Sequence, residues 1–287
     1  MLSAFTIVRN ALKLNFPIVA TICSVLGVCD EVVVNVGRSD DETREVIEGI
    51  RDSRIRIIES LWDMGRGDEM LARETQRAMD ACCGSWGIYI QADEVLHERG
   101  ATILSEKVAE CDADPQVEGL VVRYLHFYGD FDHVATSRRW YRREVRCVRL
   151  GVGIHPYQGA QGFRVGPECR KIRARLTEAQ MFHYGWARPA ATLREKLKTT
   201  KEMYPWAARR LDRVLARGTL EWIPLRRRFH GSHPAVAREW IAANALEAHP
   251  TIEPRHFRPA HVRLYVSDAV ERLTGVRLFE FRNYTLV

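Results

Sequence analysis

Apolar strands alternate with amphipathic helices over the first third of this chain, and this alternation restricts the fold more than any other feature. Runs of β-branched and apolar residues predict strands at 2–8, 31–36 and 54–59, and a fourth strand that ends at residue 90. Helices are expected between them at 18–26, 42–50 and 68–81. Strand 31–36 is nearly all valine, as expected when both faces of a strand are buried. This order predicts an α/β fold with a mostly parallel central sheet flanked by helices.

Polar loops follow these strands. Parallel strands all end at one edge of a sheet, so the loops should meet there, where such sheets bind ligands. They are Arg9-Asn10, 35–41, 62–67 and Gln91-Ala92-Asp93-Glu94. Carboxylates at the tip of an apolar strand indicate a metal or a polar ligand, or else a solvated turn. No G-x-G-x-x-G or Walker sequence occurs, so neither of those phosphate loops is expected.

The composition limits the class of partner. The net charge of +6 favours anionic partners such as nucleotide phosphates, nucleic acid or a membrane surface, although most Arg residues are expected to pair with the 37 acids. Basic and aromatic residues do not cluster on one element, so no nucleic-acid partner is expected.

Cysteine usage and the N-terminus bear on location. An odd count of seven cysteines without a Cys-x-x-Cys pair argues against a disulfide framework or a structural zinc site. A reducing cytoplasm fits best. Polar residues interrupt the apolar N-terminus, so neither a signal peptide nor a spanning helix is expected there. Peripheral contact with the inner membrane face stays open.

The second half of the chain predicts further strands and then a mainly helical extension. A helix is expected at 99–111, and strands at 117–127, 140–150 and 173–182. Strand 140–150 alternates Arg with apolar residues, which is typical of a half-exposed edge strand, with Arg149 the residue best suited to contact a ligand. Helices are expected at 193–215, broken at Pro205, and at 235–248, and a docked strand after Gly275. We therefore expect a catalytic domain at 1–190 and an extension at 191–287 packed on it.

Three of the segments together resemble the N-terminal half of a family 2 glycosyltransferase. They are Phe5 to Asn10, the turn Val34-Asn35-Val36-Gly37-Arg38-Ser39-Asp40, and Gln91-Ala92-Asp93-Glu94. The family's counterparts are a first strand ending in Asn, a Val-Asp-x-Gly-Ser-x-Asp turn and an Asp-x-Asp motif, and a bacterial subgroup reads Gln-Ala-Asp-Glu in the third place.

The resemblance implies a GT-A fold, that of the nucleotide-diphospho-sugar transferases. It also implies a UDP- or GDP-linked sugar donor and transfer with inversion to a carbohydrate or lipid-linked acceptor. A divalent metal, Mn²⁺ or Mg²⁺, would bind the donor diphosphate. Two positions depart from the pattern. Asn35 stands where an Asp recognises the base, and Gln91, a poor metal ligand, replaces the first Asp of the motif.

The resemblance also assigns roles to individual residues. Asp93 would hold the metal, assisted by His183 or His233, although a lone His after a strand is as often a packing residue. Region 151–166, where related enzymes often carry the general base, offers Gln158 and Gln161, which cannot take a proton. The residues implied in donor binding are Val8, Arg9, Asn10, Asn35, Gly37, Asp63, Gln76, Gln91 and Ala92. The remaining candidates for the base are Asp130, Asp132, Glu94 and Glu168.

Two other functions compete with glycosyl transfer. A nucleotidylyltransferase shares the layout but usually opens with a Gly-rich phosphate loop, and residues 8–16 contain no glycine. A non-catalytic module that binds a glycan or a nucleotide is favoured by Asn35, by Gln91 and by the lack of an evident base. Turnover of a donor separates this module from an enzyme.

Overall fold

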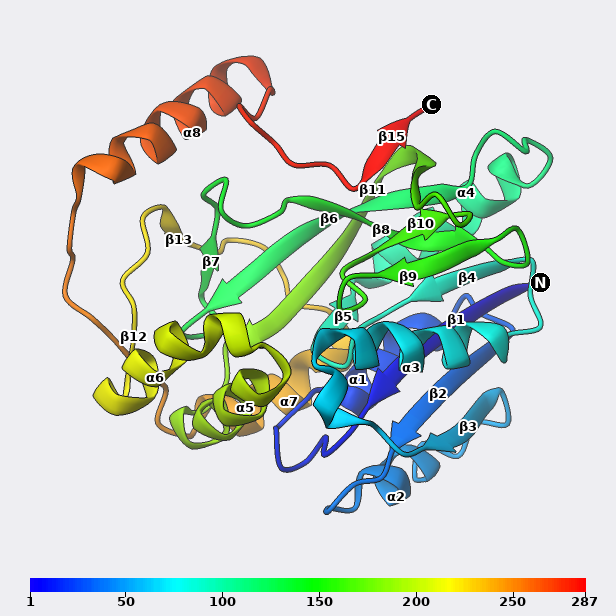
Figure 1. The fold of residues 1–287 in the computed structure, drawn as a ribbon, viewed down its shortest axis with the longest axis horizontal. Helices are drawn as coiled ribbons and strands as arrows, with labels where there is room; N and C mark the ends of the chain where they lie inside the picture. The colour runs from blue at the N-terminus through cyan, green and yellow to red at the C-terminus, as the bar shows by residue number, and fades with distance from the viewer.

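A large mixed β-sheet forms the centre of the protein, and helices flank it (Figure 1). The computed structural model describes residues 1–287, apart from the side chain of Pro205. The main path of the sheet has the order β3-β2-β1-β4-β8-β6-β11-β10-β9, which confirms the predicted α/β class. These strands are β1 (Leu2–Val8), β2 (Glu31–Gly37), β3 (Ile55–Ser60), β4 (Trp86–Tyr89), β6 (Gly119–Tyr128), β8 (Arg143–Arg149), β9 (Ile154–Tyr157), β10 (Gly162–Val165) and β11 (Arg170–Trp186).

The first four strands on the path pair in parallel, as predicted. Helices α1 (Ile18–Leu26), α2 (Thr43–Glu48) and α3 (Asp68–Asp80) connect them. Val32, Val33 and Val34 of β2 are fully buried because helices cover both faces of the strand. The parallel pairing brings the carboxyl ends of β1, β2 and β4 to one edge of the sheet.

Strand β8 corrects the sequence-based expectation of an exposed edge. It lies inside the sheet, antiparallel to both β4 and β6. Arg146, at its centre, is completely buried. Arg149 does not face a ligand site: its guanidinium lies over the Trp86 ring and donates to the carbonyl oxygens of Cys111 and Val117. The alternation of Arg with apolar residues led to the wrong prediction, because a solvent-exposed arginine and an arginine paired inside the core give the same sequence pattern.

The other half of the sheet contains strands that the sequence did not reveal. β9 and β10 form an antiparallel hairpin within the Gly-rich region 151–166. β11 is longer than predicted because it pairs successively with β10, with β6 and, near its end, with the short strand β5 (Glu94–Leu96). β5 thus brings Glu94 beside His183 of β11. The remaining short elements are β7 (His133–Ala135), β12 (Thr219–Leu220), β13 (Arg226–Arg228), β14 (Thr251–Ile252), η1 (Met64–Arg66), η3 (Ala235–Ala237) and η4 (Pro259–His261).

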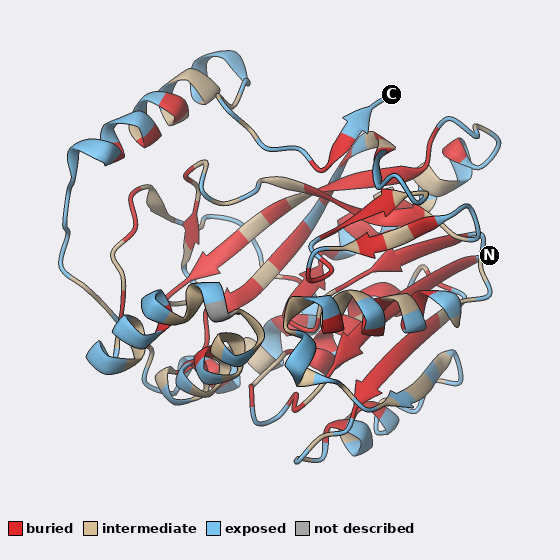
Figure 2. Cartoon of the chain, in the orientation of Figure 1, coloured by how far each residue is buried: buried red, intermediate tan, exposed pale blue. Residues whose placement is uncertain are grey.

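Two hydrophobic clusters occupy the two sides of the sheet. One contains α1 and α4 (Glu98–Cys111) together with Trp86 and Ile88. The other contains Phe5, Tyr89 and Phe163, whose rings contact one another. Figure 2 shows the central strands almost entirely buried, whereas the surrounding helices bury only one side.

The C-terminal extension begins with two helices that lie at the edge toward which β6 and β11 point (Figure 1). These are α5 (Ala190–Met203) and α6 (Ala208–Arg217), joined by η2 (Pro205–Ala207), so the predicted break at Pro205 is confirmed. Helix α7 (Arg238–Ala245) is shorter than predicted because its first turn is the 3-10 segment η3. The predicted terminal strand is β15 (Tyr284–Leu286), which pairs in parallel with β11.

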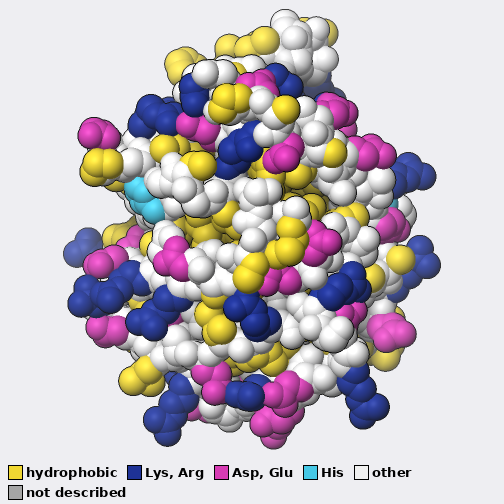
Figure 3. All heavy atoms as spheres, turned by 90° about the vertical axis from the view of Figure 1, so that its right-hand side faces the viewer, with side chains coloured by type: hydrophobic (Ala, Val, Ile, Leu, Met, Phe, Trp, Pro, Cys, Tyr) yellow, Lys and Arg dark blue, Asp and Glu magenta, His cyan; other side chains and the backbone are white. Residues whose placement is uncertain are grey.

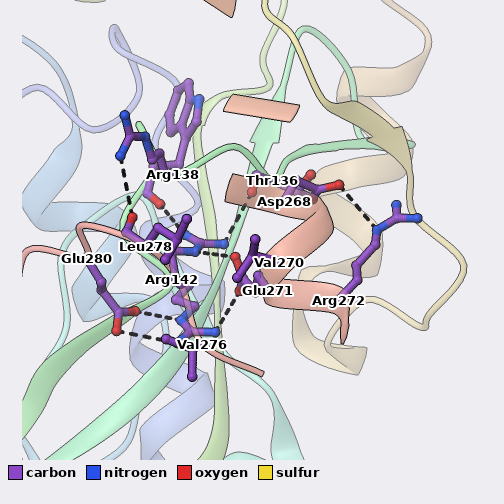
Figure 4. Close-up of polar contacts among 12 residues, drawn as sticks. Thr136, Arg138, Arg142, Asp268, Val270, Glu271, Arg272, Val276, Leu278 and Glu280 are labelled. Carbon is purple, nitrogen blue, oxygen red and sulfur yellow. Dashed lines mark hydrogen bonds and ion pairs between the residues drawn. The ribbon is translucent and has the colours of Figure 1, made fainter. Parts of the chain in front are cut away.

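Ion pairs fasten the outer helix α8 (Val262–Thr274) to the sheet. Figure 4 shows Arg142 between Glu271 of α8 and Glu280 of the following segment, and each contact is 2.6 Å. On the face shown in Figure 3, Lys and Arg side chains lie among Asp and Glu side chains. Within the part of the chain that the structure describes, no helix is long and apolar enough to cross a membrane.

A completely buried ion pair joins the start of β5 to the centre of β8. Arg146 donates from Nε and Nη2 to the two carboxylate oxygens of Glu94, both at 3.1 Å. The Tyr124 hydroxyl donates to Glu94 at 2.7 Å. Arg146 also donates to the carbonyl oxygen of Gln161, so its charge is compensated from several elements.

We predict that Glu94→Gln lowers the free energy of unfolding by about 3–5 kcal/mol, because it leaves the Arg146 charge buried without its partner. The measurement is urea denaturation followed by circular dichroism. Glu110→Gln, which breaks the more exposed Lys107–Glu110 pair, is the control and should cost less than about 1 kcal/mol. Equal effects of the two substitutions would contradict the structural role of the buried pair.

Candidate active site

A cavity of about 590 Å³ opens at the carboxyl ends of β1 and β4. The loops after these strands form one side, η1 and α3 form the second, and the end of β11 forms the third. Helices α5 and α6 and the η2 turn complete it. The polar and aromatic residues that line it are Arg9, Asn10, Phe16, Trp62, Tyr89, Gln91, Asp93, Tyr141, Gln161, His183, Trp186, Lys196, Thr199, Thr200, Tyr204, Trp206 and Arg210.

Seven of the residues selected from the sequence line this cavity. Asn10 adopts a left-handed backbone conformation (φ 54°), and its amide contacts Asp40 while its Oδ1 accepts the backbone N–H of Asp40 at 2.8 Å. The loop after β1 and the loop after β2 are therefore joined through the Asn10 side chain. The seven residues are Val8, Arg9, Asn10, Gln91, Ala92, Asp93 and His183.

Asn35 and Gly37 do not line the cavity, but they contact residues of the segments that surround it. Asn35 is completely buried, donates to Glu74 and accepts from the Ser60 hydroxyl at 2.7 Å. Gly37 makes room for the indole of Trp62, because a Cβ at this position would lie 2.6 Å from that ring. The second signature turn thus positions Trp62, which the sequence had shown only as a loop residue.

Asp63 and Gln76 lie outside the cavity lining and bond to neighbours in sequence. Asp63 accepts the backbone N–H of Gly65 and pairs with Arg66. Gln76 donates to Asp80, one turn later in α3.

The acidic residues considered as general base also lie outside the lining. Glu94 is engaged by Arg146 as described above. Asp130 pairs with His133 and with Arg226, and the exposed residue Asp132 follows it in the same loop. Glu168 is a solvent-exposed neighbour of the β10–β11 turn. None of these four carboxylates belongs to the cavity that the described residues form.

His233 is part of an aromatic cluster away from the cavity. Its Nδ1 lies 2.8 Å from the Tyr184 hydroxyl, and its Nε2 lies 3.1 Å from the carbonyl oxygen of Phe131. Burial lowers the pKa of His233. The structure therefore brings His183, and not His233, to Asp93.

Asp93 is the carboxylate at the centre of the cavity's polar cluster. The Lys196 ammonium donates to Asp93 Oδ2 at 2.7 Å, and His183 Nε2 lies 3.6 Å from the same atom. Arg188 Nη2 lies 3.9 Å from it. Burial alone would raise the pKa of Asp93, but these neighbours outweigh burial and hold that pKa well below its usual range.

A chain of ring contacts fixes the tautomer of His183. His126 Nε2 lies 2.7 Å from the carbonyl oxygen of Tyr141 and must donate to it. Burial lowers the pKa of His126 well below its usual range, so this ring is neutral and its Nδ1 is an acceptor. His183 Nδ1, at 3.1 Å, therefore donates to His126. His183 Nε2 then faces Asp93 and the cavity: it donates to Asp93 when it carries a proton, and it has a free lone pair only when the ring is neutral.

Two cationic side chains, Lys196 and Arg188, lie near Asp93. Burial lowers the pKa of Lys196 to about 8, against the opposing effect of Asp93. Burial also lowers the pKa of Arg188 to about 10. Both side chains follow β11 in sequence, and Lys196 belongs to α5. Neither residue could be singled out from the sequence, because a Lys on an amphipathic helix normally indicates a solvated face.

The cluster does not fit the divalent metal that the sequence resemblance implies. At phosphate sites Mg²⁺ is held by one or two free carboxylates together with substrate phosphates and waters, and Mn²⁺ also prefers carboxylate and water ligands. Among the described residues, no group of three or more His, Cys, Asp and Glu could hold a metal ion. Asp93 and His183 converge, but Lys196 already occupies the Asp93 oxygen that faces His183. Gln91, in the place of the motif's first Asp, donates at 3.4 Å to the carbonyl oxygen of Ala160.

Comparison with known proteins gives partial structural likenesses. No protein-family model matches the chain, and no curated protein matches it in sequence. S. aureus TarS residues 1–349 in complex with UDP-GlcNAc shares 14% identity, with 76% of this chain and 71% of that chain covered at a TM-score of 0.44.

Two further solved structures match a smaller share. A second structure of TarS from S. aureus shares 17% identity over 47% of this chain, at a TM-score of 0.37. The match spans 23% of the length of that chain. Glucosyl-3-phosphoglycerate synthase from Mycobacterium tuberculosis, in complex with Mn²⁺, UDP and phosphoglyceric acid, shares 18% identity. The match covers 44% of this chain and 43% of the synthase chain, at a TM-score of 0.30.

Gly185 is the residue that allows Asp93 and His183 to approach each other. A Cβ at this position would lie 2.6 Å from His183 Nε2 and 2.9 Å from Asp93 Oδ2. We predict that Gly185→Ala lowers the free energy of unfolding by about 1–3 kcal/mol through overpacking. Urea denaturation measures the effect, and Gly27→Ala, where no atom lies within 4 Å of the added Cβ, is the control. A Gly185→Ala protein as stable as the wild type would show that the cluster is not closely packed.

Proposed function

We propose that this protein is a glycosyltransferase of the GT-A type that moves a sugar from a nucleoside-diphosphate donor to an acceptor hydroxyl. The observation that carries the proposal is the convergence of the first and third signature loops on one cavity, with Trp62 and the Asp93–Lys196 cluster on its walls. Aromatic faces suit a nucleoside base, and a cluster with two cations and one carboxylate suits a diphosphate.

The proposal assigns different lining residues to the different parts of such a donor. Trp62, with Arg9 and Asn10, is the proposed binding surface for the nucleoside. Lys196 is placed to bind the diphosphate. The proposal keeps the extension 191–287 as the part that shapes the acceptor side, and it is supported by the contribution of α5, η2 and α6 to the lining. A carbohydrate or lipid-linked hydroxyl is the proposed acceptor.

The proposed reaction needs a proton acceptor beside the incoming hydroxyl. The acceptor oxygen attacks the anomeric carbon, the bond from that carbon to the diphosphate oxygen breaks, and the hydroxyl proton passes to a base. Attack from the face opposite the leaving group inverts the anomeric centre. Among the described lining residues only Asp93 and His183 carry a carboxylate or an imidazole that can accept a proton. Asp93 is held by Lys196, so His183, whose Nε2 faces the cavity and is free to accept a proton when the ring is neutral, is the proposed base.

The test of the function is a panel of UDP- and GDP-linked sugars, measured first by thermal shift and then by donor hydrolysis and transfer. A bound donor raises the melting temperature by mass action. We predict that Trp62→Ala weakens binding of the preferred donor by about 1–3 kcal/mol through loss of stacking. Leu61→Ala, at the exposed neighbouring residue, is the matched control and should leave binding unchanged.

Binding without hydrolysis or transfer would support the competing function of a non-catalytic nucleotide-binding module. Failure of every donor in the panel to bind or to react would contradict both functions. UDP-GlcNAc, the ligand of one structural neighbour, is a practical first choice for the panel.

His183 gives a sharper test of mechanism. We predict that His183→Gln lowers kcat about 10²–10⁴-fold, because the base is lost, while the affinity for the donor changes little. Single-turnover transfer and titration with the donor separate the two quantities. His230→Gln, at an exposed histidine outside the cavity, is the control. A His183→Gln protein that loses donor affinity but keeps kcat would assign His183 to donor binding instead.

A further inference from the structure

Lys196 places its ammonium group beside Asp93 and at the cavity lining. Its ammonium donates to Asp93 Oδ2 at 2.7 Å and to the carbonyl oxygen of Gly185 at 2.9 Å. An ammonium has three N–H donors, so one is left. Lys196 lines the cavity, where that third donor can meet a ligand oxygen.

Arg188 adds a second charge from beneath. It is completely buried, its guanidinium lies over the Phe16 ring, and Nη1 donates to the carbonyl oxygen of Leu14. Its Nε and Nη2 atoms have no hydrogen-bond partner among the described residues. Nη2 lies 3.9 Å from Asp93 Oδ2. A buried guanidinium with unpaired nitrogens strongly favours an anion nearby, and Asp93 alone supplies one negative charge against two positive ones.

The cluster therefore carries a net positive charge when Asp93 is ionised and both cations are protonated. Asp93 contributes −1, and Lys196 and Arg188 contribute +1 each. A divalent ion added at the same carboxylate oxygen would meet Lys196 at hydrogen-bond distance and would increase the unbalanced charge in a largely buried place. Lys196 and Arg188 thus supply positive charge at the place where a metal ion would supply it.

We propose that Lys196, supported by Arg188, binds and neutralises the donor diphosphate in place of a divalent metal. Asp93 then acts as the residue that holds Lys196 in position, and not as a metal ligand. This inference rests on the proposed function, because it concerns the leaving diphosphate of the same donor. When the bond from sugar to diphosphate breaks, the developing negative charge on the diphosphate oxygen is stabilised by the ammonium group.

Calorimetric titration with UDP, repeated with GDP, tests the inference in excess EDTA and again in excess MnCl₂. We expect the dissociation constant of the nucleotide that binds to agree within about threefold between the two conditions. Lys196→Met should weaken binding at least about tenfold in EDTA, because it removes a charge-assisted hydrogen bond. Lys196→Arg should restore part of the affinity.

Lys198→Met is the matched control on the same helix. Lys198 is exposed and pairs with Glu195, so its loss should change UDP affinity less than about twofold. Asp93→Asn gives the strongest discrimination. An Asn can still accept from Lys196, so nucleotide binding in EDTA should survive, whereas a metal ligand could not be replaced in this way. Near-UV circular dichroism checks that each variant is folded. If Lys196→Met does not fold, the comparison of wild-type affinity in EDTA and in MnCl₂ decides whether binding needs a metal.

Nucleotide binding by the wild type only in MnCl₂, lost again in Asp93→Asn, would overturn the inference and leave the proposed function standing. Equal weakening by Lys196→Met and Lys198→Met would also overturn it. If neither UDP nor GDP binds in either condition, the proposed function fails and the inference fails with it. Metal-independent binding that depends on Lys196 is the result that supports both.

Discussion

The buried pair of Glu94 and Arg146 is the interaction on which the site depends. It joins the start of β5 to β8, and Glu94 also accepts the backbone N–H of Gln91, in the loop after β4, at 3.1 Å. A bidentate arginine–carboxylate contact fixes both distance and direction, and both side chains are completely buried. Asp93 directly precedes Glu94, so the same pair determines where Asp93 stands. The polar edge of the cavity is therefore anchored from the core and not from its solvent side.

Two neighbouring carboxylates thus have different tasks because their surroundings differ. Glu94 is satisfied within the core by Arg146, Tyr124 and the backbone, and no part of it faces the cavity. Asp93 faces the cavity and is held by Lys196. Burying two adjacent carboxylates without cations would be very costly, and each has its own cation from a different part of the chain. The sequence Gln-Ala-Asp-Glu alone contains no sign of this division.

The sequence predicted the parallel half of the fold well and the site only in part. Local patterns were sufficient for β1 to β4, because valine-rich strands and amphipathic helices alternate there. They failed for β8, where Arg146 pairs with a residue 52 positions earlier in the chain, since no local pattern reports such a partner. Motif order located Asn10, Gln91, Asp93 and His183 in the cavity. It missed Trp62 and Lys196, whose positions depend on packing against Gly37 and on how α5 docks.

The position of Lys196 ties the site to the docking of the C-terminal segment. Asp93 comes from the end of the first half of the sheet, while Lys196 comes from α5, beyond the expected boundary at residue 190. If α5 moved away, Asp93 would lose its shortest ionic contact and the cavity would lose one of its walls. The ion pair and the enclosure of the cavity therefore form or fail together. A diphosphate that bound to Lys196 would add a further contact across the same junction and would favour the closed arrangement, since a ligand stabilises the state that binds it. Binding of the donor and docking of α5 are thus expected to be coupled in free energy.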